Sequence, residues 1–281
     1  MSTPPSALEK RVHDKPTGEI TVKFEDVSIA FEDKVVLDRI SFELVHGETK
    51  AIFGVAGSGK STLLKLALGL LRPDSGRIFV LGEEVTAMTE DQLFELRRRV
   101  GIVFQESALF DSLTVRENVA FRLYEEGKVS EEEIDERVRE ALSFVELEHT
   151  VDLYPSELSG GMRRRVSIAR TIITHPEVLL YDSPTGGLDP VTSNTIIELV
   201  VKQRDMYKIS SLLVTHRLQD AFTMATHYFD RAENKMTPLP PHARTEVPFS
   251  FLILRDAHII FDGDLQEIRE TRDEYIREYI S

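Results

Sequence analysis

The sequence of 281 residues contains no cysteine, which excludes disulfide bonds and thiolate metal sites. It also lacks an apolar run of the roughly 18 residues that a bilayer-spanning helix needs. The most apolar candidate, Leu63–Leu71, is short and contains Lys65. The start of the chain has no apolar segment of the kind found in secretory signals, so we interpret residues 1–19 as a flexible tail.

Positive charge is also scarce. Lysine and arginine number 34, against 48 aspartates and glutamates, which gives a formal net charge of -14 at pH 7. Proteins that bind nucleic acid usually present a basic face, so we expect no nucleic-acid partner, although residues 163–165 could form a local basic patch. The length suffices for one large α/β domain with an embedded subdomain, or for two small domains.

The pattern of apolar residues predicts an α/β fold with two additions. Alternation over 20–31 and 35–45 predicts strands of a half-exposed antiparallel sheet. Ser130, followed by Glu133, indicates a helix with a capping box, and residues of about 105–160 are predicted to form an inserted helical subdomain.

After the helical subdomain, helices and strands alternate from residue 162 to residue 215, which predicts a parallel sheet. Strands are expected at 50–53, 78–81, 178–181 and 210–215, and residues 249–254 and 258–261 are expected to form a hairpin. The helices are expected at 60–71, 162–174, 191–206 and, at the C-terminus, 265–281. The polar, proline-rich residues 231–248 are predicted to be a surface loop.

A phosphate-binding motif lies between a predicted strand and a predicted helix. Residues 54–61 satisfy the pattern G-x-x-x-x-G-K-[ST] in the context that the pattern requires. Glycines allow backbone N–H groups to face phosphate oxygens, and the helix N-terminus adds a favourable dipole. The predicted site for ATP consists of Gly54, Val55, Ala56, Gly57, Ser58, Gly59, Lys60, Ser61 and Thr62.

Two of these residues have specific expected roles. Lys60 reaches the β- and γ-phosphates in such motifs, and the hydroxyl of Ser61 ligates Mg²⁺. A separate apolar strand, Val178–Asp182, ends in a carboxylate. An acidic residue at such a strand end beside a phosphate loop holds Mg²⁺, usually through water, so Asp182 is expected to complete the metal site.

Further motifs follow in an order that resembles ABC ATPases. The segment Leu158–Met162 is similar to the LSGGQ signature of that family and precedes Asp182, as the family requires. Gln105 resembles the Q-loop glutamine of the family, and residues 187–189 resemble its D-loop. His216 resembles the switch histidine. Phe31 lies where an aromatic residue stacks on adenine in the family, although an alternating strand also suits a core phenylalanine.

The resemblance spans about residues 20–264 and implies a P-loop NTPase (RecA-like) α/β core with an antiparallel β-subdomain and an inserted α-helical subdomain. It implies a homodimer with two copies head to tail, in which ATP lies between Lys60 of one copy and the signature of the other. The implied signature and D-loop contacts are Ser159, Gly160, Gly161 and Asp189. Gln105 would join Ser61 and Asp182 at Mg²⁺, and Gln105, Ser183 and His216 would surround the reacting phosphate.

A closer resemblance covers residues 106–121, which are similar to the ATPases of Mla/Mce lipid-transport systems and their chloroplast relatives. It implies that about 106–121 docks an integral membrane permease, that an MCE-type substrate-binding protein belongs to the complex, and that the cargo is phospholipid or a related lipid. The chain would then lie on the cytoplasmic face of the inner (plasma) membrane as a peripheral subunit.

One position departs from the ABC pattern. The family normally has a glutamate after the strand-end aspartate, where it polarises the attacking water, and this chain has Ser183. A hydroxyl cannot act as a base near neutral pH, and loss of a positioned base costs about 10²- to 10⁴-fold in rate. Slow hydrolysis could persist through His216, Glu106 could substitute, or the chain could be a hydrolysis-deficient regulatory cassette. Because positioning and charge stabilisation dominate phosphoryl transfer, the sequence favours weakened ATPase activity.

Two other classes are disfavoured. ABC machines of translation carry two cassettes in one chain and those of DNA repair carry long coiled coils, and this acidic chain shows neither feature. A P-loop kinase or GTPase would not contain the signature-like segment 158–162.

Overall fold

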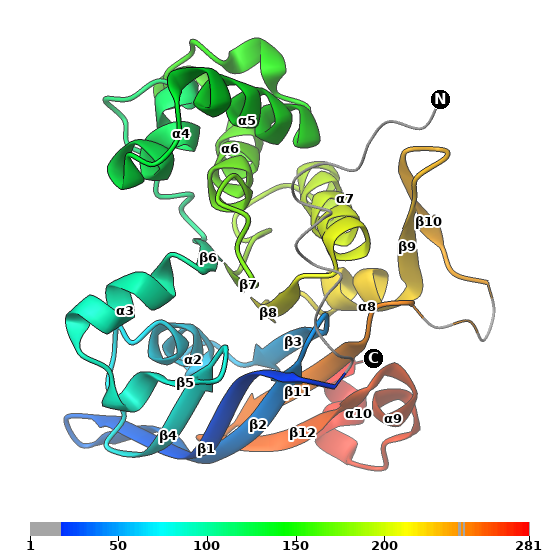
Figure 1. Ribbon diagram of the computed structural model, residues 1–281. Helices are drawn as coiled ribbons and strands as arrows, with labels where there is room; N and C mark the ends of the chain where they lie inside the picture. The colour runs from blue at the N-terminus through cyan, green and yellow to red at the C-terminus, as the bar shows by residue number, and fades with distance from the viewer. Residues whose placement is uncertain (1–17, 241–242, 244, 281) are drawn as a thin grey trace.

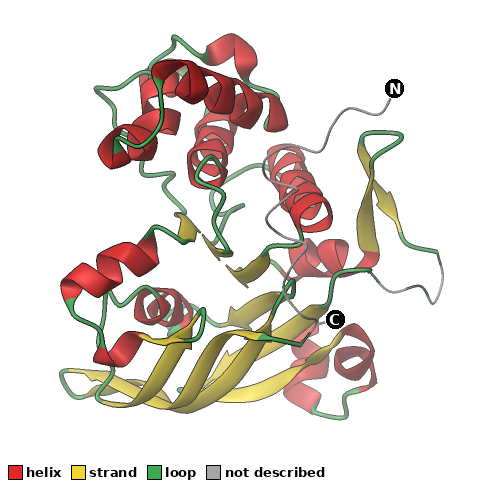
Figure 2. Cartoon of the chain, in the orientation of Figure 1, coloured by secondary structure: helices red, strands yellow, loops and turns green. Residues whose placement is uncertain are grey.

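The chain divides into a strand-rich region and a cluster of helices at the opposite end (Figures 1 and 2). The computed structural model describes residues 18–240, 243 and 245–280. Residues 1–17 of the predicted N-terminal tail therefore lie outside the described residues. Within the described segments, no helix is both long and apolar enough to cross a membrane.

An antiparallel sheet forms the outer layer of the strand-rich region, with the strand order β2-β1-β4-β5. Its two long strands pair from Ile20↔Val45 to Phe31↔Lys34, with several register shifts between these ends. The structure thus confirms the two predicted half-exposed strands. The strands are β1 (Ile20–Phe31), β2 (Lys34–Val45), β4 (Ser75–Val80) and β5 (Glu83–Glu84).

A six-stranded sheet with the order β12-β11-β3-β8-β7-β6 forms the core. Its inner strands run parallel, and β12 pairs antiparallel with β11, as the sequence pattern predicts. The strands are β3 (Thr49–Gly54), β6 (Val100–Val103), β7 (Val178–Asp182), β8 (Ser210–Val214), β11 (Phe249–Arg255) and β12 (His258–Asp264).

Successive residues of these strands enter two separate apolar clusters, one on each face of the sheet. On β3, Ile52 packs with α2 (Lys60–Ala67) and the antiparallel sheet. Its neighbour Phe53 packs with α7 (Pro190–Tyr207) and α8 (Leu218–Thr226) on the other face. Both faces of the sheet are covered, so its carboxyl edge is the part left to carry polar side chains.

The inserted region is helical, as predicted. Helix α6 packs against α4 and α5 of this region, and it also contacts β6 and α7 of the core. The elements are α4 (Val115–Glu126), α5 (Glu131–Phe144), η2 (Glu148–Thr150), η3 (Pro155–Glu157) and α6 (Gly160–Ile172). Two short elements precede β6, namely η1 (Val85–Ala87) and α3 (Glu90–Arg97).

The predicted capping box at α5 forms only in part. Ser130 Oγ accepts the Glu133 N–H at 3.3 Å, as predicted. The Glu133 carboxylate, however, pairs with Arg137 one turn later in the helix. A complete box occurs instead at α4, where Thr114 and Glu117 bond reciprocally.

Two terminal predictions are corrected. Residues 231–248 are not only a loop, because β10 (Lys235–Pro238) pairs with β9 (His227–Asp230) and this hairpin packs on α7. The predicted C-terminal helix 265–281 is two helices, α9 (Leu265–Glu270) and α10 (Glu274–Ile280). The break arises because Asp273 begins the second helix, with its carboxylate accepting the N–H of Ile276 at 3.0 Å. Helix α2 is also shorter than predicted, because the chain turns at Gly69 with φ +63°.

Candidate functional site

The phosphate loop connects β3 to α2 at the carboxyl edge of the core sheet. Gly54, Gly57 and Gly59 adopt φ values of 151°, 77° and 94°, which residues with a side chain rarely adopt. A Cβ at Gly54 would lie 2.5 Å from the carbonyl oxygen of Leu254, and one at Gly59 would lie 2.7 Å from a methyl group of Leu37. Helix α2 begins without a side-chain cap, so its first N–H groups can face an anion.

Lys60 and Asp182 bring opposite charges to this loop. The Lys60 ammonium donates to the carbonyl oxygens of Gly54 and Val55, each at 2.8 Å. Burial lowers the pKa of Lys60, and the charge of Asp182 opposes that effect. Ser61 Oγ donates to Asp182 Oδ1 at 2.9 Å, so a hydroxyl and a carboxylate from distant segments meet here.

This oxygen pair fits Mg²⁺ bound together with a nucleotide. Among the described residues, no group of three or more histidine, cysteine, aspartate or glutamate side chains could hold a metal alone. Mg²⁺ typically uses one or two carboxylates, waters and substrate phosphates. Ser61 and Asp182 are therefore suited to that ion, and Lys60 to phosphate oxygens.

Gln105 and His216 lie at the same edge of the sheet. Gln105 follows β6, and its side chain passes the segment after β7 so closely that a Cβ on Gly186 would be 3.1 Å from Gln105 Cδ. His216 is exposed and lies two residues beyond the end of β8. Because β3, β8, β7 and β6 are adjacent and parallel, their ends bring both residues to the edge that carries Asp182.

Ser183 follows β7 in a left-handed backbone conformation, with φ +50°. Its N–H donates to the carbonyl of Val214 at 2.9 Å. Its carbonyl accepts the N–H of Gly186 at 2.9 Å and a guanidinium N–H of Arg164 at 3.0 Å. The backbone at this position is thus held by contacts that do not depend on its side chain.

Sequence reasoning missed the group that supports the loop after His216. The carboxylate of Asp220 is buried, accepts a hydrogen bond from Thr185 Oγ1 at 2.5 Å and lies 3.5 Å from Arg217 Nε. Burial raises the pKa of Asp220, while Thr185, Arg217 and His216 oppose the rise. The only sequence signal was helical spacing, since Asp220 lies one turn beyond His216.

The signature segment lies on a different element from the phosphate loop. Ser159 caps α6, where its hydroxyl accepts the Met162 N–H at 3.2 Å, and Ser159 and Gly160 are exposed. Gly161 is required sterically, because a Cβ there would lie 2.3 Å from Thr192 Cγ2. Helix α6 packs on the helical region, whereas α2 packs on β3, β4, β7 and β8, and Figure 1 shows the two helices well apart.

Asp189 caps α7 close to this signature. Its carboxylate accepts the N–H groups of Val191 and Thr192 at 3.0 and 3.1 Å. The hydrogen bond from the Thr192 hydroxyl is the largest cause of the lowered pKa of Asp189. The signature and Asp189 therefore form one surface, which does not contain the phosphate loop of the same chain.

Phe31 ends β1 with 44% of its surface exposed, so it does not pack in the core, the alternative that its strand pattern left open. Phe110 is equally exposed at 44%, and its ring lies tilted by 38° against that of Phe121, with centroids 4.5 Å apart. The fully buried Asn118 side chain accepts the Phe110 N–H at 2.8 Å and donates to its carbonyl at 3.0 Å. The loop that presents Phe110 is therefore fixed by Asn118 of helix α4.

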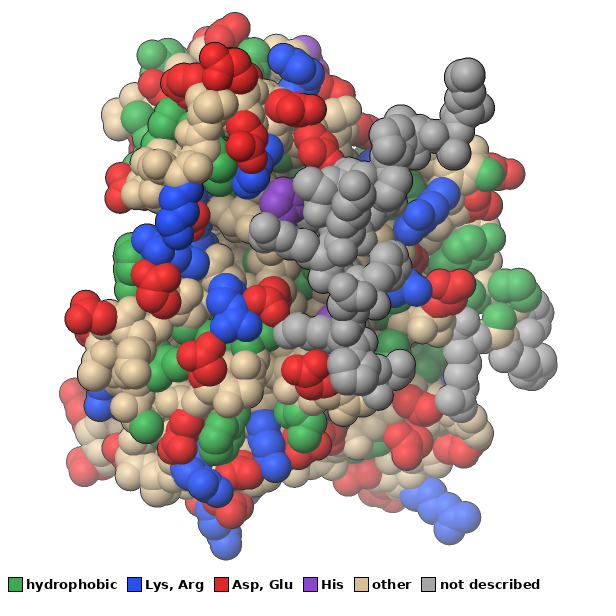
Figure 3. All heavy atoms as spheres, viewed as in Figure 1, with side chains coloured by type: hydrophobic (Ala, Val, Ile, Leu, Met, Phe, Trp, Pro, Cys, Tyr) green, Lys and Arg blue, Asp and Glu red, His purple; other side chains and the backbone are tan. Residues whose placement is uncertain are grey.

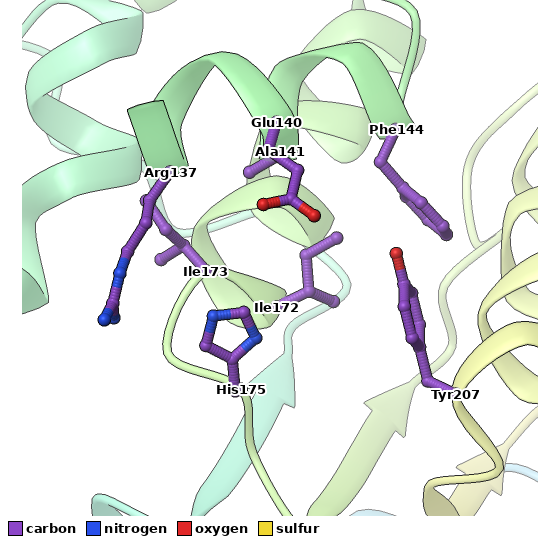
Figure 4. A pocket seen from close by; sticks show the side chains of 8 residues that line it. All are labelled: Arg137, Glu140, Ala141, Phe144, Ile172, Ile173, His175 and Tyr207. Atoms are coloured by element: carbon purple, nitrogen blue, oxygen red, sulfur yellow. The ribbon is translucent and has the colours of Figure 1, made fainter. Parts of the chain in front are cut away.

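One further hollow of the described chain is too small for a nucleotide. The cavity between α5 and α7 measures only about 10 Å³, which is about the space of one water. Figure 4 shows the ring of Tyr207 facing Phe144 across it, with centroids 5.7 Å apart. On the face that Figure 3 shows, acidic and basic side chains are interspersed, and Arg164 of the suggested basic patch is buried.

The fold and this edge of the sheet define a P-loop nucleotide-binding domain. Residues 37–186 match the family model described as "ABC transporter", and the chain belongs to that family. A solved structure of the dimeric ATP-binding cassette MJ0796, in a post-hydrolysis state bound to ADP and Pi, superimposes with a TM-score of 0.72 at 28% identity. That match covers 87% of this chain and 99% of the cassette, which bears out the predicted fold.

Three curated relatives illustrate the breadth of the family. Protein TRIGALACTOSYLDIACYLGLYCEROL 3 of Arabidopsis thaliana is 43% identical, over 71% of this chain and 62% of that protein. The methionine import ATP-binding protein MetN of Carboxydothermus hydrogenoformans is 40% identical, over 71% of this chain and 59% of that protein. The intermembrane phospholipid transport system ATP-binding protein MlaF of Haemophilus influenzae is 33% identical, over 76% of this chain and 81% of that protein. The chain thus spans less than two thirds of the first two relatives.

Proposed function

We propose that this chain is the ATP-binding and ATP-hydrolysing subunit of an ABC transporter that moves phospholipid or a related lipid in an Mla/Mce-type system. One observation carries the nucleotide part of the proposal. Ser61 and Asp182 meet beside the Lys60 ammonium at the base of the phosphate loop, 121 residues apart in sequence but 2.9 Å apart in space. The charges and oxygen ligands suit MgATP.

The second part of the proposal is a head-to-tail homodimer. The exposed signature residues Ser159 and Gly160 lie on α6, away from the phosphate loop of their own chain. The N-terminal N–H groups of α6 are suited to a γ-phosphate held by a second copy, because a helix N-terminus favours an anion. ATP bound by Lys60 of one copy would then draw the signature of the other copy toward it. Phe31 is available to stack on adenine, and Asp189 adjoins the signature.

The membrane partner is proposed to dock on about 106–121. An exposed Phe110, fixed in place through Asn118, offers an apolar contact for a permease helix. Such a partner places the chain on the cytoplasmic face of the inner (plasma) membrane, with an MCE-type protein in the same complex. The formal charge of -14 supports the absence of a nucleic-acid partner.

Hydrolysis is proposed to be real but weakened. A carboxylate at position 183 would orient the attacking water, and Ser183 cannot replace its basicity. Lys60, Asp182, Gln105 and His216 remain to position and stabilise the phosphoryl group. The alternative is a hydrolysis-deficient regulatory cassette. Measurement of phosphate release by the purified chain separates the two, because only the alternative requires no turnover at all.

The cargo is tested most directly with the native complex. The names of the relatives point to phospholipid for MlaF and to methionine for MetN, so the experiment must offer both. The complex isolated through this chain is reconstituted in phospholipid vesicles with MgATP, and a Lys60→Ala complex serves as the control. ATP-dependent phospholipid transfer without methionine uptake supports the proposal. Methionine uptake without lipid transfer refutes it.

A further inference from the structure

Arg164 is a buried cation, 4% exposed, on the signature helix α6. No carboxylate lies within ion-pair distance of its guanidinium in the described part of the chain, although the charge of Glu106 partly offsets the effect of burial on its pKa. Burying an arginine in this way is costly unless its donors are satisfied. The contacts that satisfy it come from two segments of the candidate site.

The first segment is the loop of Gln105. Arg164 Nε donates to Ser107 Oγ at 3.2 Å, and Nη2 donates to the carbonyl of Gln105. Ser107 and Ala108 both have left-handed backbones, with φ values of 62° and 48°, an uncommon pair for residues other than glycine. Arg170, less than two turns later on α6, donates to both of their carbonyls at 2.9 and 2.7 Å. The loop conformation therefore depends on α6.

The second segment follows Asp182. Arg164 Nη1 donates to the carbonyls of Ser183 and Pro184 at 3.0 and 2.8 Å, and Nη2 contacts the carbonyl of Gly186 at 3.4 Å. An arginine has five N–H donors in a rigid fork, and these contacts with the Gln105 loop and the Ser183 segment use all of them. One side chain thus joins the signature helix, the Gln105 loop and the backbone of position 183.

We propose that Arg164 is a positioning residue that fixes the Gln105 loop and the Ser183 backbone to the signature helix as one unit. Resting on the proposed function, this means that a shift of the docking segment 106–121 reaches position 183 through the Arg164 fork. The attacking water would then be positioned only when the signature helix and the docking segment both occupy the positions that they take in the closed, ATP-bound dimer. Arg164 touches neither nucleotide nor water in this scheme.

The first experiment measures backbone hydrogen exchange in the full chain with MgATP. Three hydrogen-bonded amides report on the two segments: Ser107 N–H to Phe104 O at 3.0 Å, Ser183 N–H to Val214 O at 2.9 Å, and Gly186 N–H to Ser183 O at 2.9 Å. Arg164→Met should raise the exchange rate in both segments at least about tenfold. In the variant, a segment can open locally without first breaking hydrogen bonds to Arg164. An increase in only one segment, or in neither, overturns the proposal.

Arg165→Met is the matched control. Arg165 is the next residue of α6, is half-buried and also donates to a backbone carbonyl, that of Val145 at 3.0 Å. It contacts neither of the two segments through a hydrogen bond, so its variant should leave their exchange unchanged. Arg164→Lys covers the case in which Arg164→Met does not fold, since an ammonium has only three donors and lacks the fork. Wild-type exchange in both segments of Arg164→Lys would contradict the proposal.

Kinetic measurements distinguish a positioning role of Arg164 from a role in the stability of the fold alone. Arg164→Lys should lower kcat for ATP about 10- to 100-fold, since misplacement of about 1 Å has effects of that size. KM for ATP should change less than about twofold, because the Lys60 site is untouched. A parallel fall in affinity and kcat would indicate general damage and refute the positioning role. If the wild-type chain shows no turnover, the proposed hydrolysis fails, and the exchange measurement still decides whether Arg164 joins the segments.

Discussion

Ser183→Glu restores a carboxylate at the position next to Asp182. The backbone there already has φ +50° and is held by hydrogen bonds from Arg164, from Gly186 and to Val214, so the exchange of side chains introduces no new backbone strain. A positioned base contributes about 10²- to 10⁴-fold to such reactions. Ser183 is only 7% exposed, so part of that gain is lost in accommodating a longer side chain. We expect turnover to rise at least about tenfold, which is about 1.4 kcal/mol of barrier.

The assay combines steady-state phosphate release with size-exclusion chromatography. Wild-type chain should shift from monomer to dimer with MgATP and dissociate slowly, because the γ-phosphate contacts from both copies persist until hydrolysis. Ser183→Glu should shorten the lifetime of the dimer in step with its faster turnover. Ser183→Gln is the matched control, because glutamine has about the size of glutamate but no charge. Its turnover of ATP should not exceed that of the wild-type chain. Fast wild-type turnover that Ser183→Glu leaves unchanged would refute the reasoning, and Glu106 and His216 would then be the next residues to replace.

The remaining predictions concern binding, docking, pH and capping. Lys60→Ala should weaken MgATP binding at least about 100-fold by removing a charge-assisted contact, and unchanged affinity in a nucleotide titration would show that phosphate binds elsewhere. Phe110→Asp should abolish co-purification with the permease while ATP affinity stays at the wild-type value; normal co-purification would exclude this docking surface. Burial raises the pKa of Asp220, so the unfolded chain releases this proton at lower pH than the folded chain does. The free energy of unfolding should therefore fall as pH rises from about 3.9 through the raised pKa of Asp220. In a plot of the denaturant midpoint against pH, Asp220→Asn should remove this fall. If the fall is unchanged in the variant, other groups cause it. Thr114→Ala removes the complete capping box of α4 and should cost about 1 kcal/mol, lowering Tm by about 2–4 °C; an unchanged Tm in thermal unfolding would show that the box contributes little to stability.

Much of the fold follows from periodicity. The alternation over β1 and β2 and the apolar runs of β7 and β8 specify their structure because burial on one or both faces dictates the pattern. The hairpin of β9 and β10 could not be predicted in this way, because each strand has only four residues and its support is tertiary. Met236 N–H donates to Glu198 on α7 at 2.8 Å, a contact that no local pattern encodes.

The candidate site was predictable where chemistry fixes residue types in short motifs, as in the phosphate loop and Asp182. The residues that support the site could not be predicted in this way. Arg164 donates to backbone carbonyl groups, which every residue type has, so the sequence carries no signal for these contacts. The break before α10 had a local signal, since Asp273 is a good helix N-cap, but the charged helical pattern on both sides concealed it.

The hydrogen bonds that hold position 183 all involve its main chain, and this has a consequence for how such a chain evolves. A substitution there would alter the chemistry of the edge without removing these main-chain hydrogen bonds, so serine and glutamate are alternative side chains on the same backbone. On the proposed function, the rate of hydrolysis would set how long two copies stay closed on ATP. The residue at position 183 would then determine the lifetime of the closed dimer while the architecture stays the same.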